Sequence, residues 1–509
     1  MISMQPIDFF LRGAKYAPDR DAVSEPESGR CLTYSQVRTQ TDALACAFQK
    51  LSGKSRPTVA ILAGNSIEML LGILATYAVS GVLVPLTPTL VERDIARQLE
   101  CAEPDLVLFD PAYRDLLVSY VGCRISTVKI EGCVAVSTLL SEYALQTPLR
   151  SNPDLAETVA IKFTGGSSGI PKAVLQSFRC INTMVISLMM VYGFDQNERF
   201  IVAPPLTHGA GTFVLPVLGA GGCLVVMSKP SARQLHEALQ AQGATSTWVP
   251  PTLLYKLLEE QKLRKAQFPK LRNLLYGGAP CTPIAIHETI AHFGPVLGAT
   301  YGLTEAPVII AGLTGEEGAL PQNLGSAGRI GPMVCVAVLD EHDQICMAPG
   351  QFGEIVVSGD LLMSGYLNME EQTRSVLRDG WFHTGDLGYI DERGYLFIKG
   401  RTKDIVITGG FNVYPSDVEE VYARHEHILE CLVFGVTDEL WGERVEMAVV
   451  STPGVSLGVD SLIEFGKRHL GSVRTPKVIH FMDHFPKNEL GKINKRQIIE
   501  MVQATKINS

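Results

Sequence analysis

The amino-acid sequence predicts an α/β protein: a large N-terminal domain of layered α/β subdomains with a small β subdomain, followed by a small mobile α/β C-terminal domain. Three observations support this fold class. The chain has 509 residues, which at about 150 residues per domain allows several domains. Hydrophobic residues make up 46% and charged residues 19% of the chain, as in a globular protein with a large core. Short β-rich runs alternate with helical patterns, which favours mostly parallel sheets covered by helices.

The alternation begins near residue 59. Residues 59–62 (Val-Ala-Ile-Leu) predict a buried strand, and a helix is expected from about Ile67 to Ser80. Asn65 or Ser66 would cap that helix and Gly81 would stop it. The next strand begins at residue 82. Further strand–turn–helix units are predicted at Val159–Phe163, Cys223–Met227 and Leu274–Tyr276.

The second half changes character twice. Between about Arg329 and Val357, β-rich runs punctuated by Gly and Pro predict the small β subdomain. A boundary is expected at Gly394–Arg401, so that residues 1–399 form the large domain and residues 400–509 the small one. Within the small domain, helices are predicted near Ser416–Arg424 and Ser461–Leu470, and strands near Cys431–Val436 and Glu446–Val450.

Composition excludes several classes of protein. Acidic residues number 53 and Lys+Arg 44, a net charge of −9, and no basic stretch is present, so neither nucleic acid nor an anionic membrane is an expected partner. The uncharged stretches Met69–Val91 and Phe200–Met227 are broken by Pro and Gly, so no transmembrane segment is expected. Eleven cysteines without C-x-x-C spacing and a start, Met1–Arg20, without signal character predict reduced core cysteines and a cytoplasmic protein.

One glycine-rich segment carries the sharpest chemical signal. It follows the predicted strand Val159–Phe163 and contains Thr164, Gly165, Gly166, Ser167, Ser168, Gly169 and Lys172. Glycines let the backbone approach an anion, hydroxyls and N–H groups can donate to phosphate oxygens, and the lysine adds positive charge. The segment is not a Walker A loop, because Pro171 precedes the lysine and Ala173 follows it.

A serine hydrolase is an alternative for the same residues. Residues 165–169 match G-x-S-x-G after a strand, as in a nucleophile elbow, which would make Ser167 the nucleophile. They also look like the start of the serine-rich run of amidase-signature hydrolases, although Pro171 stands where that run has its last serine. The elbow does not explain the lysine at the end of the loop.

Further motifs follow in a fixed order. They are Leu32–Ser35, Val84–Pro88, Tyr301–Glu305 (Tyr-Gly-Leu-Thr-Glu), Gly353–Ile355 with Ser364–Tyr366, Thr384–Asp386, Gly400–Asp404 and Pro486–Lys492. Each is weak alone. Together with the glycine-rich segment they resemble the adenylate-forming superfamily of acyl-CoA synthetases, peptide-synthetase adenylation domains and luciferases, in its acid–CoA ligase branch. The resemblance covers nearly the whole chain.

The resemblance implies an ATP site. Thr164–Lys172 would wrap the β- and γ-phosphates, and Asp386 with Arg401 would fix the ribose. Gly277, Gly278, Ala279, Pro280, Tyr301 and Gly302 would frame adenine. Thr304 would donate to the α-phosphate, Glu305 would hold Mg²⁺ through oxygen, and Lys492 would meet both the α-phosphate and the substrate carboxylate.

The resemblance also implies a fatty or aromatic acid as substrate. Its pocket would contain His208, Gly209, Trp248, Gly277 and Gly278. Thr207 stands where amino-acid-activating relatives have an aspartate, which argues against an ammonium group in the substrate. His208 would lie beside this pocket as a catalytic residue, although a role in the core or at a cap is nearly as well supported.

Two steps are implied: formation of an acyl-AMP, then transfer of the acyl group to the thiol of coenzyme A. The small domain would rotate about Lys403 between them, and Gly409, Gly410 and Phe411 would line the pantetheine tunnel. A carrier protein with a phosphopantetheine arm is the alternative acceptor. A monomer or a homodimer is expected. The pair His425 and His427 is assigned to a solvated helix face rather than to a metal site.

Overall fold

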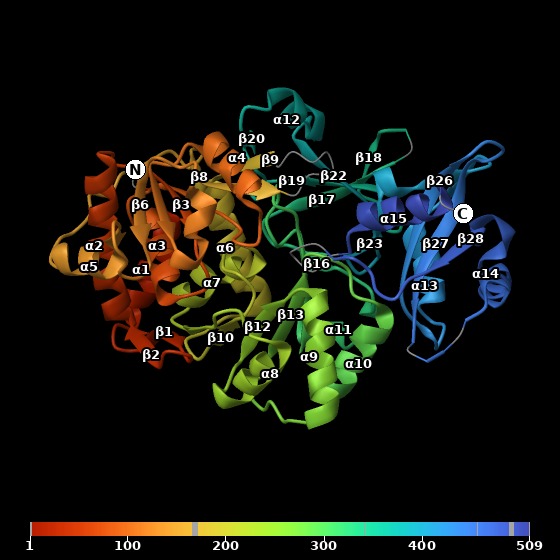
Figure 1. The fold of residues 1–509 in the computed structure, drawn as a ribbon, viewed down its shortest axis with the longest axis horizontal. Helices are drawn as coiled ribbons and strands as arrows, with labels where there is room; N and C mark the ends of the chain where they lie inside the picture. The colour runs from red at the N-terminus through yellow and green to blue at the C-terminus, as the bar shows by residue number, and fades with distance from the viewer. Residues whose placement is uncertain are drawn as a thin grey trace.

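The computed structural model describes residues 3–164, 172–340, 342–452, 454–455, 457–487 and 493–507. Figure 1 shows three β-sheets arranged side by side with helices packed on them. The first two sheets lie in the N-terminal part, and the third is formed by the C-terminal part of the chain. The mixed α/β architecture, with a large N-terminal part and a small C-terminal one, is confirmed.

The first sheet has the strand order β20-β9-β8-β4-β3-β5-β6-β7. Its inner strands are parallel, whereas β8 pairs antiparallel with β9, and β9 with β20. The bounds are β3 (Thr58–Leu62), β4 (Val82–Pro85), β5 (Leu106–Phe109), β6 (Cys123–Ser126), β7 (Val134–Ala135), β8 (Thr158–Thr164), β9 (Lys172–Ser177) and β20 (Gly365–Tyr366). The crossovers from β3 to β4 and from β4 to β5 contain helices, whereas β6 and β7 are joined by a short loop.

The second sheet has the order β18-β17-β19-β22-β23-β16-β15-β14-β13-β12-β10-β11-β1-β2, with β21 paired to β22. Its bounds are β1 (Asp21–Glu25), β2 (Arg30–Thr33), β10 (Arg199–Val202), β11 (Cys223–Val226), β12 (Ser246–Val249), β13 (Asn273–Gly277), β14 (Leu297–Tyr301), β15 (Ala311–Leu313), β16 (Gly328–Ile330), β17 (Cys335–Leu339), β18 (Ile345–Cys346), β19 (Gly353–Ser358), β21 (Leu377–Arg378), β22 (Trp381–Ile390) and β23 (Tyr395–Arg401). The strands predicted as a small β subdomain therefore continue the same hydrogen-bonded sheet through β15 and β16.

The third sheet has the order β25-β24-β27-β26, with β28 paired to β27. Its bounds are β24 (Val406–Thr408), β25 (Phe411–Val413), β26 (Ile428–Asp438), β27 (Gly442–Ser451) and β28 (Val478–Phe481). Helices α13 (Pro415–Tyr422), α14 (Val459–Arg474) and α15 (Lys495–Ile507) accompany it (Figure 1). The predicted elements of this region are thus present, and β26 and β27 extend further than the sequence indicated.

The remaining helices belong to the first two sheets. They are α1 (Pro6–Tyr16), α2 (Tyr34–Ser52), α3 (Ile67–Ala78), α4 (Glu92–Ala102), α5 (Val136–Glu142), α6 (Phe178–Tyr192), α7 (Val214–Gly219), α8 (Ala232–Ala241), α9 (Pro251–Arg264), α10 (Pro283–Phe293), α11 (Gly315–Gly318) and α12 (Glu370–Val376). Short 3₁₀ turns lie at η1 (Pro111–Leu117), η2 (Gly209–Phe213), η3 (Pro321–Asn323) and η4 (Thr402–Asp404).

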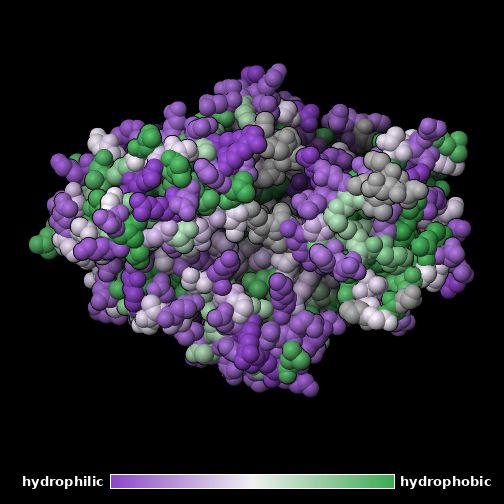
Figure 2. Space-filling model, viewed as in Figure 1, coloured by the Kyte–Doolittle hydropathy of each residue, from purple (hydrophilic) through white to green (hydrophobic). Residues whose placement is uncertain are grey.

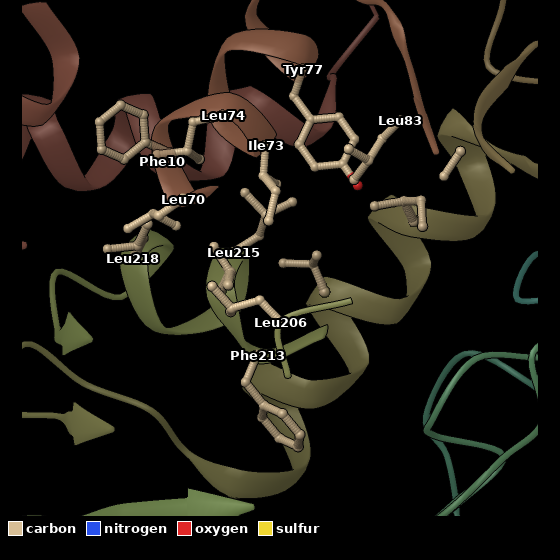
Figure 3. Close-up of a cluster of buried hydrophobic side chains, with 14 of the residues drawn as sticks. Phe10, Leu70, Ile73, Leu74, Tyr77, Leu83, Leu206, Phe213, Leu215 and Leu218 are labelled. Atoms are coloured by element: carbon tan, nitrogen blue, oxygen red, sulfur yellow. The ribbon is translucent and has the colours of Figure 1, made fainter. Parts of the chain in front are cut away.

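Helix α3 shows how local sequence sets an element. Ser66 Oγ accepts a hydrogen bond from the N–H of Met69 and caps the helix, as predicted. The helix ends at Ala78 rather than at Ser80, because Ser80 adopts a left-handed backbone with φ of 56°. All but one of its residues are buried, and Figure 3 shows Leu70 and Ile73 directed toward Leu218 and Leu215 of α7, with Leu74 beside Phe10 and Tyr77 beside Leu83.

The histidines near residue 425, the cysteines and the apolar helices bear on three further predictions. His425–His427 was expected on a helix, but α13 ends at Tyr422, and His425 Nδ1 accepts from the N–H of His427 in the following turn at 3.3 Å. All eleven cysteines are free, yet only Cys46, Cys180 and Cys223 are buried, so the expectation of core cysteines is wrong for most of them. In the described part of the chain no helix has both the length and the apolar character to cross a bilayer.

Candidate functional site

The site is built at the carboxyl ends of neighbouring parallel strands. Trp248 lies near the end of β12, Gly277 ends β13 and Tyr301 ends β14, and the register pairs Gly277 with Thr300 across the last two strands. In sheets of this kind ligands bind outside the carboxyl ends of the strands. The fold therefore brings these three predicted site residues, which are far apart in the sequence, to one edge.

A buried carboxylate lies at the same edge. The Tyr301 hydroxyl donates to Oδ2 of Asp386 at 2.7 Å, and Arg401 Nε donates to Oδ1 at 2.9 Å. Asp386 and Arg401 are paired in register on β22 and β23. Asp386 is only 4% exposed, so its carboxylate is oriented from both sides by fixed donors.

Burial determines the protonation of this group. It raises the pKa of Asp386, while Arg401 and the Tyr301 hydroxyl act in the opposite direction. Burial, followed by the Asp386 charge, raises the pKa of Tyr301 well above its usual range, so the phenol stays a donor. A carboxylate oxygen can accept about two hydrogen bonds, so each oxygen of Asp386 keeps capacity for a ligand hydroxyl.

A second carboxylate, that of Glu305, is connected through Tyr366 to Lys172 at the start of β9. Tyr366 on β20 donates to Oε1 of Glu305 at 2.8 Å, and Lys172 Nζ lies 4.7 Å from the centroid of the Tyr366 ring. Lys172 pairs in register with Thr164, so these two residues mark the base of the segment between β8 and β9. The carbonyl of Thr304 accepts from Gln176 Nε2 at 2.8 Å, which ties residues 304 and 305 to β9.

Several predicted site residues lie outside the described residues. They are Gly165, Gly166, Ser167, Ser168 and Gly169 in the glycine-rich segment, and Lys492 near the C-terminus. Their predicted roles stay predictions.

The residues predicted for the acid pocket lie together. Trp248 Nε1 donates to Thr300 Oγ1 at 3.0 Å, which fixes the indole ring. A Cβ atom at Gly209 would lie 2.5 Å from that ring, and one at Gly277 would lie 2.2 Å from Thr300 Oγ1. Glycine at both positions keeps the space beside the indole open.

His208 adjoins these glycines. Its Nε2 lies 3.3 Å from Thr87 Oγ1 and its Nδ1 lies 2.7 Å from Thr207 Oγ1. The ring is therefore held between the loop after β4 and the start of η2. Gly278, with a positive φ of 81°, turns the chain out of β13 toward Ala279 and Pro280 at the same edge.

The C-terminal residues lie on the third sheet and its connection. Lys403 is in η4, between β23 of the second sheet and β24 of the third. Gly409 and Gly410 form the two-residue turn of the β24–β25 hairpin with φ of 56° and 80°, and Phe411 is 61% exposed. On the face shown in Figure 2 the surface is mostly hydrophilic and is hollowed between the large N-terminal part and the C-terminal part.

Sequence reasoning assigned no role to Tyr366, Thr300 or Gln176, although all three position site residues. Tyr366 belongs to the motif Ser364–Tyr366, but the sequence does not show that its hydroxyl donates to Glu305. Thr300 directly precedes Tyr301 but faces the indole. Among the residues that the structure describes, no group of three His, Cys, Asp or Glu side chains is arranged to hold a metal ion.

The comparisons with known proteins cover nearly the whole chain. Residues 10–367 match the family model of the AMP-binding enzyme, and residues 417–492 match that of its C-terminal domain. The medium/long-chain-fatty-acid–CoA ligase FadD8 of Mycobacterium tuberculosis is 30% identical, over 92% of this chain and 85% of its own. The 2-succinylbenzoate–CoA ligase of Bacillus mycoides is 29% identical, over 97% of this chain and 98% of its own.

A solved structure agrees with these relatives. The amide bond synthetase McbA of Marinactinospora thermotolerans superposes with a TM-score of 0.89 at 28% identity, over 98% of this chain and 99% of that one. The resemblance stated from the motifs is confirmed: the chain belongs to the AMP-binding enzyme family.

Proposed function

We propose that the protein is an ATP-dependent carboxylic acid–CoA ligase that acts through an acyl-AMP. The observation that carries the proposal is the Asp386 carboxylate, held between Tyr301 and Arg401 at the carboxyl edge of the second sheet. The relatives named as CoA ligases support the same activity. Neither hydrolysis through Ser167 nor loading of a carrier protein is favoured by these relatives.

ATP would bind across the edge of the second sheet. The two oxygens of Asp386 would accept hydrogen bonds from the paired hydroxyls of ribose, and Arg401 would hold the carboxylate in place. Tyr301, Gly302 and the turn Gly277–Pro280 would frame adenine. The segment from Thr164 to Lys172 would enclose the β- and γ-phosphates, and Tyr366, which contacts both Lys172 and Glu305, would place Glu305 near them.

Glu305 fits Mg²⁺ by the chemistry of its donor atoms. Mg²⁺ usually takes one or two carboxylates together with phosphate oxygens and water, so one glutamate beside a triphosphate is a sufficient protein contribution. Tyr366 donates to one of its oxygens and thereby orients the carboxylate. When bound, the ion would neutralise charge that builds on the phosphates.

In the first step the acid lies in the pocket formed by His208, Gly209, Trp248, Gly277 and Gly278. Its carboxylate oxygen attacks the α-phosphorus of ATP, the bond to the bridging oxygen breaks, and pyrophosphate leaves. Thr304 and Lys492 would donate to the α-phosphate oxygens while negative charge builds there. His208, fixed by Thr87 and Thr207, would position the acid.

In the second step the thiolate sulfur of coenzyme A attacks the acyl carbonyl and AMP leaves. We propose that residues 1–399 and 400–509 act as two domains that reorient about Lys403, which removes Lys492 and admits the thiol. The boundary lies near the end of β23, just before η4. Gly409, Gly410 and Phe411, at the turn of the β24–β25 hairpin, would contact the pantetheine arm.

The test is pyrophosphate release from MgATP with a panel of fatty and aromatic acids, with and without coenzyme A. Release that depends on the acid, and thioester that forms only with coenzyme A, is the expected result. Lys492→Ala should abolish pyrophosphate release. Lys495→Ala is the matched control, because Lys495, on α15, has an acidic partner within the protein, Asp404 at 3.3 Å. Release without thioester would move the acceptor to a carrier protein or an amine.

A further inference from the structure

A small cavity lies between α3, β4, β8, α6, η2 and α7. Its volume is about 30 Å³, and most of its wall is apolar. Figure 3 shows five of the lining side chains, from Ile73, Tyr77, Leu83, Leu206 and Leu215, directed toward one another. A water molecule needs about 10–15 Å³ of such space, so the cavity has room for about two water-sized atoms.

One lysine lines this apolar cavity. Lys162 lies on β8, where its neighbours Ile161 and Phe163 pack into the cluster on the opposite face of the sheet. Among the described residues no carboxylate pairs with its amine, and burial lowers its pKa. The nearby thiol of Cys180 provides no counter-charge, since burial raises its pKa to about 12 and the thiol donates to the carbonyl of Leu361 at 3.1 Å.

A second donor lines the same cavity. Tyr77 is 6% exposed, and its side chain lines the cavity together with Lys162. Burial raises the pKa of this phenol, so it remains a donor. An amine and a phenol hydroxyl thus stand in the wall of one mostly apolar cavity. Two donors at one small cavity point to a ligand that carries hydrogen-bond acceptors.

The cavity adjoins the proposed acid pocket. Gly211 and Thr212 of its wall follow His208 and Gly209 in the same η2 segment. Pro85, also in the wall, lies two residues before Thr87, whose Oγ1 is 3.3 Å from His208 Nε2. Along β8, Lys162 is two residues from Thr164, about 7 Å inward from the proposed phosphate site.

We propose that the cavity is the inner end of the acid pocket, and that Lys162 and Tyr77 bind there a second carboxylate, carried at the far end of a dicarboxylic acid substrate. This inference rests on the proposed function. It refines the expectation of a plain fatty or aromatic acid. The two oxygens of a carboxylate match the room in the cavity, and its charge would pair with the lysine within a mostly apolar wall.

The test compares acids that differ only at the far end. Adipate is paired with hexanoate, suberate with octanoate, and terephthalate with p-toluate, and 2-succinylbenzoate is added. Pyrophosphate release is measured for wild type, Lys162→Met and Tyr77→Phe. Met184→Leu is the control, because Met184 lines the same cavity without contributing charge. Lys162→Met should fold, since the side chains around it are apolar.

The expected result is that wild type prefers a diacid to its matched monoacid. Lys162→Met should lose about ten- to a hundredfold in kcat/KM for the diacid, the loss typical of a hydrogen bond to a charged group, and retain the monoacid. Tyr77→Phe should lose less, and Met184→Leu should keep the wild-type preference. A wild-type preference for monoacids, or an equal loss for both acids in Lys162→Met, would overturn the proposal.

A binding measurement separates this proposal from the proposed function. Calorimetric titration of the diacids without ATP should give binding about tenfold or more weaker in Lys162→Met than in wild type. Weaker diacid binding in Lys162→Met would support the subsite whether or not any acid releases pyrophosphate. Absence of pyrophosphate release with every acid would refute the ligase activity. No diacid binding in wild type, or equal binding in both proteins, would refute the subsite.

Discussion

Asp386 and Arg401 face each other across the antiparallel pair β22–β23, with Arg401 Nε 2.9 Å from Oδ1 of Asp386. Arg401 is the last residue of β23 and directly precedes η4, where the chain passes to the C-terminal sheet. Because Tyr301 holds the other oxygen, the carboxylate on β22 is linked to the last residues of β14 and β23. The ribose site proposed here depends on that arrangement.

Replacing this carboxylate should weaken ATP binding. Asp386→Asn keeps the side-chain shape but removes the charge, so kcat/KM for ATP should fall about ten- to a hundredfold. Initial rates of pyrophosphate release against ATP concentration measure it. The control is Asp391→Asn, which breaks the Arg393–Asp391 pair between the same two strands. Equal losses in the two variants would contradict a role in nucleotide binding.

Adding a methyl group beside the indole should affect the acid and not ATP. In Gly209→Ala the new Cβ would lie 2.5 Å from the Trp248 ring, which Thr300 holds in place. We expect KM for the acid to rise by on the order of tenfold, while KM for ATP stays within about twofold. Gly211→Ala serves as contrast, because its Cβ would meet the Leu206 carbonyl at 1.9 Å and should impair folding. A changed KM for ATP in Gly209→Ala would argue against the assigned pocket.

The glycine turn of the third sheet should matter for thioester formation. Gly409→Ala places a Cβ at φ of 56° and 2.7 Å from the Trp441 ring. Thioester formation should slow by on the order of tenfold while acid-dependent pyrophosphate release persists. Gly380→Ala controls for backbone strain, which costs about 1–2 kcal/mol, since its φ is 80° and a Cβ there would contact nothing. Loss of both half-reactions in Gly409→Ala would instead indicate general damage to the site.

Stability should depend on pH through a glutamate of α13. Burial raises the pKa of Glu419 to about 7, although the N–H of Val433 donates to its carboxylate. A raised pKa means that the folded state holds a proton which the unfolded state releases at about pH 4.5. The contribution is therefore present below pH 4.5 and is lost as the pH rises to about 7.

Glu419→Gln should flatten this dependence. We expect the wild-type free energy of unfolding to fall between pH 5 and 8 by on the order of 2 kcal/mol more than that of the variant. Urea denaturation at both pH values measures the difference. Glu420→Gln is the control, because Glu420 is partly exposed and pairs with Arg424. An unchanged pH dependence in Glu419→Gln would refute the assignment.

The order of strands and helices could be predicted because it depends on local patterns. Val59–Leu62 and the capping by Ser66 are read from neighbouring residues, and both are present. Strand pairing is not local. The run from Arg329 to Val357 reads as a separate β subdomain, yet β16 joins it to β15 through hydrogen bonds that no sequence period reports.

The site divides in the same way. The family resemblance pointed to Asp386, Tyr301 and Trp248, but not to the hydrogen bond from Tyr301 to Asp386 or to the one that fixes the indole on Thr300. Lys162 was overlooked because it lies within an apolar strand. Strand geometry could have pointed to Lys162. Successive side chains of a strand point to opposite faces of the sheet, so Lys162 lies on the face opposite to Ile161 and Phe163.

The central claim is that the acid is activated as an acyl-AMP and then transferred to coenzyme A. The most direct measurement uses an acid whose carboxylate oxygens are both labelled with heavy oxygen, with MgATP and coenzyme A, and mass spectrometry of the products. Attack of the carboxylate on the α-phosphorus predicts one label in AMP and one in the thioester. Label in inorganic phosphate, or AMP without label, would contradict the account.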